Sequence, residues 1–155
     1  MKRKQVRPIA ICVFRKDDMI FVAEGYDPAD KETFYLPLGG EIEFGEYGYQ
    51  TIVREIREEI GAEIKNLQYL TTIENIFTYN GQQGHEVVLV YEEEFQDRTI
   101  YEKETVKGRD DGETCFEATW TPLADFQSRQ AALYPEGLLR LLKRHPNRES
   151  ETIPT

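Results

Sequence analysis

Four glutamates stand at ordered intervals in one short stretch of the chain: Glu46, Glu55, Glu58 and Glu59. An α-helix turns by about 100° per residue. Glu58 and Glu59 lie three and four residues beyond Glu55, so a helix would place these three side chains on one face. Their charges repel one another unless a cation compensates. Carboxylate oxygens suit Mg²⁺ or Mn²⁺, which in turn bind phosphate.

A solvated acidic helix face is the alternative interpretation of these glutamates. The glycine pair Gly39 and Gly40 precedes them at a fixed distance, and glycine lets the main chain approach a ligand closely. Arg54 can pair with Glu46 or hold one of the helix glutamates, but a single guanidinium does not balance several carboxylates. The combination of glycines and excess acid therefore favours a metal site.

The elements around these residues can be predicted from their spacing. A second stripe lies roughly 120° round the helix from the carboxylates and is formed by Tyr49, Ile52, Val53, Ile56 and Ile60. This stripe would pack into a core while the neighbouring face presents the acids. Gly61 is expected to end the helix, because glycine accepts the left-handed conformation at low cost. Residues 34–38 have extended character and lead into the glycine pair.

The rest of the chain alternates between strand and turn patterns. We predict strands at residues 9–14, 19–23, 66–79, 85–95 and 115–123, a polar loop at 25–31, a turn at 80–84, a short helix at 124–130 and a final helix from Pro135 to Pro146. Residues 96–112 are acidic and irregular and are predicted to be mobile. The element order predicts an α+β fold with a sheet between helices. One domain is expected over residues 1–145, followed by a polar tail at 146–155.

Composition limits the classes of function. The chain has 155 residues and a net charge of −10, which does not favour nucleic acid as a partner, because backbone binding needs a basic surface. A nucleotide bound through a metal stays compatible with this charge. No apolar run reaches the roughly 20 residues of a membrane span, and the basic N-terminus lacks a signal sequence, so a cytoplasmic protein without membrane contact is expected. Cys12 and Cys115 are predicted to be buried free thiols.

The acidic stretch resembles the signature of the Nudix hydrolases. From Gly40 the spacing runs through Glu46 to Arg54-Glu55-Ile56, then Glu58-Glu59, Gly61 and Ala62, so that nine specified positions match over 23 residues. There are two departures. Ala62 is smaller than the usual aliphatic residue, and Leu38 separates Pro37 from the glycine pair. Neither departure removes a charged group.

The resemblance implies a Nudix-type α/β/α sandwich with a mixed central sheet. It also implies Mg²⁺-dependent hydrolysis of the pyrophosphate bond in a nucleoside diphosphate linked to another group, with Mn²⁺ as a substitute. The substrate would be a small nucleotide such as a nucleoside triphosphate, a nucleotide sugar or ADP-ribose. Homodimers are common in this family, so a homodimer is left open.

Site roles carried over by position follow from the same resemblance. Glu58, Glu59 and the Gly39 carbonyl correspond to metal ligands, and Glu55 to a further ligand or to the base. Arg54 completes the catalytic set by orienting the carboxylates. Gly40, Glu46 and Gly61 correspond to structural positions of the motif.

Two parts of the site are less well determined by the sequence. Many family members use another acidic residue before a tryptophan-bearing strand, and here Glu113 is favoured over Glu117 because it follows a glycine-rich segment. Phe34, Tyr35 and Phe77 could stack on a nucleobase, although aromatic residues at strand spacing more often belong to a core. The alternative functions are removal of the 5′ cap of RNA and non-catalytic nucleotide sensing on the same scaffold.

Overall fold

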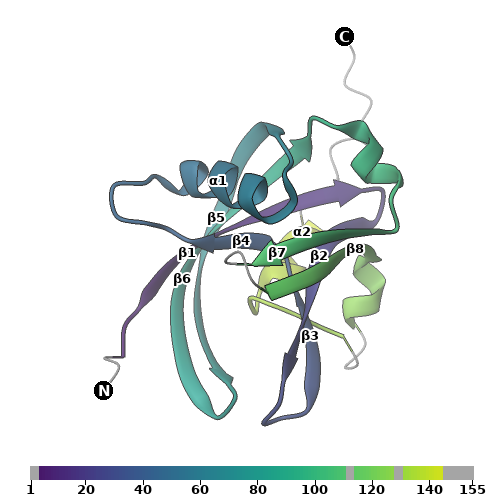
Figure 1. The fold of residues 1–155 in the computed structure, drawn as a ribbon. Coiled ribbons are helices and arrows are strands. Elements are labelled where there is room, and N and C mark those ends of the chain that lie inside the picture. Colours follow the sequence, from purple (N-terminus) through teal and green to yellow (C-terminus); the bar gives the residue numbers. More distant parts are fainter. Residues whose placement is uncertain (1–3, 111–113, 128–130, 145–155) are drawn as a thin grey trace.

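The computed structural model describes residues 4–110, 114–127 and 131–144, in which a mixed sheet lies between two helices (Figure 1). The helices are α1 (Gly48–Ile60) and α2 (Leu138–Arg144). The strands are β1 (Arg7–Lys16), β2 (Met19–Asp27), β3 (Glu32–Leu36), β4 (Leu38–Glu41), β5 (Ile64–Tyr79), β6 (Gln82–Phe95), β7 (Thr105–Asp110), β8 (Thr114–Pro122) and β9 (Ala132–Leu133). Two 3₁₀ turns, η1 (Arg98–Glu102) and η2 (Leu123–Gln127), complete the described elements.

Strand β1 is the centre of the sheet. It runs parallel to β6 and antiparallel to β4, and β5 pairs antiparallel with the other edge of β6. The end of β1 turns into β2, which pairs with both β3 and β8. Strand β7 pairs with β8, and β9 runs parallel to β3. The predicted α+β fold with a mixed sheet between helices is thus confirmed.

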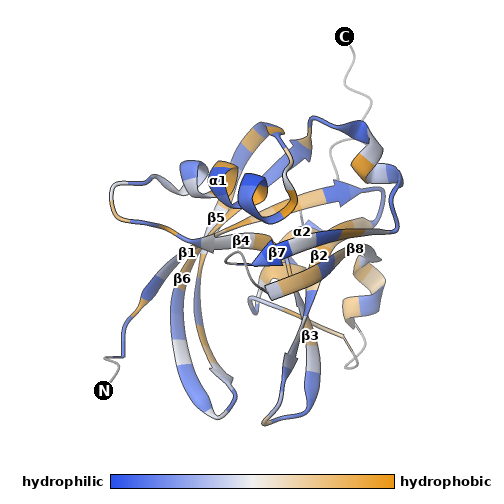
Figure 2. Ribbon diagram, viewed as in Figure 1, coloured by the Kyte–Doolittle hydropathy of each residue, from blue (hydrophilic) through white to orange (hydrophobic). Residues whose placement is uncertain are grey.

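Both faces of β1 are buried, because successive side chains of a strand point to opposite faces. Ala10, Cys12 and Phe14 pack toward α1, in a core that includes Ile52 and Ile56. The intervening residues pack toward α2, in a second core formed by Ile11, Val13, Ile20, Val22, Val88, Val90, Phe126, Leu138 and Leu142. Strand β1 is accordingly rich in hydrophobic residues, whereas the far ends of the β5–β6 and β2–β3 hairpins are largely hydrophilic (Figure 2).

Helix α1 ends where predicted and shows most of its predicted packing. Gly61 ends it in the left-handed conformation, with φ of 67°. Ile52 and Ile56 are fully buried. The prediction was wrong for Tyr49, which is 47% exposed. Tyr49 lies in the first turn of α1, where its ring stacks on that of Tyr47 at 5.7 Å, outside the core.

Three other predictions need correction. Strand β2 continues to Asp27, so the loop predicted at residues 25–31 is shorter. Residues 96–112 were predicted to be irregular, yet they contain η1 and β7, because β7 pairs with β8 along its whole length. Cys115 is exposed, unlike Cys12, because it lies on β8 opposite Arg109 in the outermost hairpin of the sheet.

The polar tail predicted at residues 146–155 lies outside the described residues. Among the described helices, none combines the length and apolar character needed to cross a membrane.

Candidate active site

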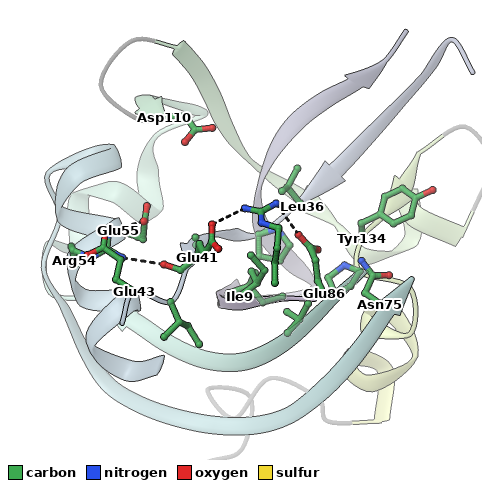
Figure 3. A pocket seen from close by; sticks show the side chains of 18 of the residues that line it. Ile9, Leu36, Glu41, Glu43, Arg54, Glu55, Asn75, Glu86, Asp110 and Tyr134 are labelled. Atoms are coloured by element: carbon green, nitrogen blue, oxygen red, sulfur yellow. Dashed lines mark hydrogen bonds and ion pairs between the residues drawn. The ribbon is translucent and has the colours of Figure 1, made fainter. Parts of the chain in front are cut away.

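A pocket of about 760 Å³ opens between α1, the β4–α1 loop and one face of β1 and β6 (Figure 3). Gly39, Gly40, Glu55 and Glu58 line it together with Arg54. The glycine pair and two of the helix glutamates therefore meet in one cavity.

The glycine pair is required by close packing. An added Cβ at Gly40 would lie 2.4 Å from Cδ of Glu55, so the carboxyl group of Glu55 occupies the space that a side chain would fill. An added Cβ at Gly39, whose φ is 158°, would lie 2.1 Å from the carbonyl oxygen of Ala10. Strand β4 can therefore lie this close to β1 only with glycine at position 39, and the Glu55 carboxyl group keeps its position only with glycine at position 40.

Arg54 connects the loop and the helix. Its Nε and Nη2 donate to the two carboxylate oxygens of Glu46 at 2.9 and 3.0 Å. Its Nη1 donates to Glu55 at 2.8 Å and lies 3.4 Å from Glu58. Mainly through the hydrogen bonds from Arg54, the pKa of Glu46 falls to about 2, and the pKa of Arg54 is raised in return. Arg54 therefore orients two of the predicted ligands while Glu46 holds Arg54.

The three helix glutamates differ in exposure. The Glu58 side chain is 62% exposed and that of Glu55 is 13% exposed. Glu59 is only 8% exposed and is not among the residues that line the pocket. It belongs to the last turn of α1, where the helix packs against β7. Glu55 and Glu58 therefore share the cavity, whereas Glu59 lies closest to the core.

The charge of the pocket fits a hard divalent cation. Six carboxylates line it, against two guanidinium groups, those of Arg7 and Arg54. The carboxylates belong to Glu41, Glu43, Glu55, Glu58, Glu86 and Asp110. Within the described part of the chain, no three acidic, thiol or imidazole groups are already close enough to hold one ion. The all-oxygen donor set and the surplus of negative charge nevertheless fit Mg²⁺ or Mn²⁺.

The predicted aromatic residues lie outside this pocket. Phe34 makes edge-to-face contacts with Tyr79 and Tyr134, and Tyr35 packs on Phe126. Phe77 covers Gly84 across the β5–β6 hairpin. None of the three predicted stacking residues is among those that line the pocket, so their predicted role in substrate binding stays a prediction.

The acidic residue expected outside the motif also stays a prediction. Glu113 lies outside the described residues, and Glu117 is exposed on β8, opposite Lys107 of β7. The structure adds Asp110, at the end of β7, to the pocket lining. Sequence reasoning missed Asp110, because it fell within the segment predicted to be irregular.

A family model described as "NUDIX domain" matches residues 4–142. The chain belongs to the Nudix hydrolase family. The resemblance of the acidic stretch is thereby confirmed, and so is the class of enzyme, a hydrolase.

Curated relatives match part of this Nudix chain. The NAD-capped RNA hydrolase NudC of Enterobacter sp. (strain 638) is 37% identical over 68 residues, which is 44% of this chain and 26% of that protein. NudC of Photobacterium profundum is 35% identical over 68 residues, covering 44% of this chain and 25% of that protein. The matched stretch thus spans about a quarter of the length of these relatives.

Solved structures share the fold. A NUDIX hydrolase from Nitrosomonas europaea aligns over 90% of this chain and 87% of its own, with a TM-score of 0.63 and 17% identity. A MutT NUDIX hydrolase from Burkholderia pseudomallei aligns over 78% and 86%, with a TM-score of 0.57 and 22% identity. At these identities the likeness supports the fold alone.

Proposed function

We propose that this Nudix hydrolase cleaves the pyrophosphate bond of a nucleoside diphosphate linked to another group, in a reaction that depends on Mg²⁺. The observation that carries the proposal is the meeting of Glu55, Glu58 and the Gly39–Gly40 pair in one pocket with a surplus of carboxylates. A phosphate anhydride could not approach so acidic a surface without a compensating cation.

The residues have distinct tasks in this proposal. Glu55, Glu58 and Glu59 would hold Mg²⁺, with the backbone carbonyl of Gly39 as a further ligand. Bound Mg²⁺ would neutralise the diphosphate and stabilise the charge that develops as water attacks phosphorus. Glu55 is the candidate to accept the proton of the attacking water. Arg54 orients the Glu55 carboxylate through its 2.8 Å hydrogen bond.

A panel of nucleotides tests this function. Nucleoside triphosphates, nucleotide sugars, ADP-ribose and NAD are incubated with Mg²⁺, Mn²⁺ or EDTA, and the products are identified by mass. We expect a nucleoside monophosphate among the products with either metal and none with EDTA. Glu58→Gln should lower kcat about 100-fold or more without a change in thermal stability, because the Glu58 side chain is largely exposed.

Glu63→Gln is the matched control for Glu58→Gln. Glu63 lies three residues beyond the end of α1 and pairs with Arg57 at 2.7 Å, outside the pocket. Its substitution should leave turnover unchanged. Nucleotide binding without turnover in any metal would contradict the proposed reaction and favour a sensor.

Hydrolysis of capped RNA is the second candidate. It is favoured by the relatives named NAD-capped RNA hydrolase, which match this chain over 68 residues. The net charge of −10 does not favour a polynucleotide partner. Turnover of NAD-capped RNA far above that of free NAD in the same panel would establish this candidate instead.

A further inference from the structure

Three polar side chains form a row across the end of the pocket that lies away from α1. Arg7 on β1 is in register with Glu86 on β6, and Glu86 is in register with Asn75 on β5. Paired residues of neighbouring strands point to the same face of a sheet. All three residues line the pocket, and Figure 3 shows Glu86 and Asn75 beside one another, opposite Glu55 and Arg54. We refer to Arg7, Glu86 and Asn75 as the polar row.

The polar row borders an otherwise apolar surface. Two residues further along, the same face carries Ile9 paired with Val88, and both of these also line the pocket. Beyond them Ile11 and Val90 belong to the core under α2. The floor of the pocket therefore changes from aliphatic to polar at one step in the sheet, which indicates a place where hydrogen bonds to a ligand can be made.

The internal contacts of the polar row leave Glu86 with capacity to accept hydrogen bonds. Nη1 of Arg7 lies 3.6 Å from Glu86 Oε2, which is too long for a good hydrogen bond. The shorter contact of Arg7, at 3.1 Å, is to Glu41. Burial raises the pKa of Glu86, whereas the charge of Arg7 and a hydrogen bond from Asn75 act in the opposite direction. A partly buried carboxylate of this kind gains most from a ligand with adjacent N–H donors.

An aromatic residue stands beside the polar row. Tyr134 lines the same pocket and is 37% exposed. Its ring is held edge-to-face against Phe34, with the ring centres 5.6 Å apart. A planar base that hydrogen-bonds to the polar row could pack on Tyr134, because nucleobases stack on aromatic side chains.

We propose that the polar row reads the base of the nucleotide and selects guanine, an inference that rests on the proposed function. Along the row stand a donor (Arg7), an acceptor (Glu86) and an amide (Asn75). The edge of guanine presents an acceptor, O6, followed by two donors, N1–H and N2–H. Arg7 donates to O6, and Glu86 accepts from N1–H and N2–H. Adenine offers a single donor group beside an acceptor, and uracil offers one donor between two acceptors, so both make fewer hydrogen bonds here.

Equilibrium binding in EDTA tests the selection of guanine without any turnover. The probes are the nucleosides guanosine, inosine, adenosine and uridine, which share the ribose and carry no phosphate for the acidic pocket to repel. Inosine differs from guanosine only by the missing 2-amino group. Wild-type protein should bind the guanosine compound about 10-fold to 100-fold more tightly than the inosine compound, the usual effect of losing a hydrogen bond to a charged group.

Two variants assign the effect to Glu86. Glu86→Gln keeps the shape of the side chain but replaces one of its two acceptor oxygens by an NH₂ donor, so it cannot accept from N1–H and N2–H side by side. The preference for guanosine over inosine should therefore fall to within about threefold. Glu74→Gln is the matched control, because Glu74 is exposed and precedes Asn75 on β5, on the opposite face. Its preference should equal that of the wild type. Thermal unfolding checks that both variants are folded.

Several results would overturn the proposal. They are equal binding of the guanosine and inosine compounds by the wild type, tighter binding of the adenosine compound, no binding at millimolar concentration, or an unchanged preference in Glu86→Gln. If Glu86→Gln does not fold, the wild-type ratios decide. Hydrolysis without a preference for guanine would contradict the role of the polar row alone, whereas selective guanosine binding without hydrolysis would contradict the proposed function alone.

Discussion

The guanidinium group of Arg54 holds both carboxylate oxygens of Glu46, at 2.9 and 3.0 Å. Thr51 donates to the same carboxylate at 2.6 Å. Glu46 lies in the loop before α1, so this pair fixes the loop to the helix. The same guanidinium reaches Glu55, and the position of a pocket carboxylate therefore depends on a contact made outside the pocket.

Glu46→Gln should destabilise the protein by on the order of 2 kcal/mol at pH 7, because it removes a charged, bidentate partner of Arg54. The pKa of Glu46 is about 2 in the folded protein, against an ordinary value of 4.5. A lowered pKa stabilises the fold fully above about pH 4.5, and this contribution is lost as the pH falls toward 2. In urea unfolding between pH 2 and 7, the free energy of unfolding of Glu46→Gln should fall less steeply toward low pH than that of the wild type.

Glu43→Gln is the control for this prediction. Glu43 lies 3.8 Å from Arg54, and its side chain is 67% exposed, so its loss should change the free energy of unfolding by less than about 0.5 kcal/mol. If the free energy of unfolding of Glu46→Gln fell toward low pH as steeply as that of the wild type, Arg54 would not hold Glu46 as the geometry indicates.

Glu93→Gln should stabilise the protein at alkaline pH. Glu93 is 3% exposed, and among the described residues its oxygens have no hydrogen-bond partner other than the weakly donating thiol of Cys12. Burial raises its pKa to about 8. The folded state therefore favours the protonated form, so stability is greatest below about pH 4.5 and falls as the pH rises toward 8.

Urea unfolding at pH 4 and pH 9 measures this effect. The advantage of Glu93→Gln over the wild type should grow between these values, by on the order of a few kcal/mol. Glu74→Gln, at an exposed position of the neighbouring strand β5, should show no such trend. If the free energy of unfolding depended on pH equally in Glu93→Gln and in the wild type, Glu93 would not be a buried, protonated acid.

The sequence allowed helix α1 and the glycine pair to be predicted because their arrangement is local. Helical periodicity places Glu55 and Glu58 on one face, and the approach of Gly40 to Glu55 follows from a motif of short span. The exposure of Tyr49 could not be predicted in the same way, because periodicity assigns a residue to a stripe but not to the part of the stripe that the sheet covers.

The polar row and Asp110 could not be predicted, because they depend on strand pairing over long distances in the chain. Arg7, Asn75 and Glu86 come from three strands, and only their register makes them neighbours. Strand β7 has the sequence TVKGRD, with a single large apolar residue. Such a segment shows no clear strand pattern, and β7 forms because β8 supplies its hydrogen-bond partners.

The two cysteines should differ in reactivity. Cys115 is exposed, whereas Cys12 is buried and its pKa is raised, chiefly by burial. Because the thiolate is the reactive form, the native protein should release one equivalent of chromophore rapidly with a disulfide reagent, and the second only after denaturation. Cys115→Ser should remove the rapid phase. Two rapid equivalents, or a rapid phase that survives in Cys115→Ser, would contradict the burial of Cys12.

Gly40→Ala should lower turnover at least about tenfold while leaving the fold intact. The new Cβ would lie 2.4 Å from Cδ of Glu55, so the Glu55 side chain must move, and displacements of about 1 Å in a catalytic group are costly. The stability should change little, because the clash is with the mobile end of a side chain. Turnover of the best substrate from the panel and thermal unfolding together measure the two effects.

Gly61→Ala should have the opposite effects, lowering stability and leaving turnover unchanged. Gly61 has φ of 67°, and an added Cβ there would meet nothing within 4 Å, so the substitution strains the backbone without touching the pocket. It should cost about 1 kcal/mol of stability and leave turnover unchanged. Full turnover in Gly40→Ala would mean that the position of the Glu55 carboxylate does not matter for hydrolysis. The role proposed for Glu55 would then have to pass to another acid of the pocket, such as Asp110 at the end of β7.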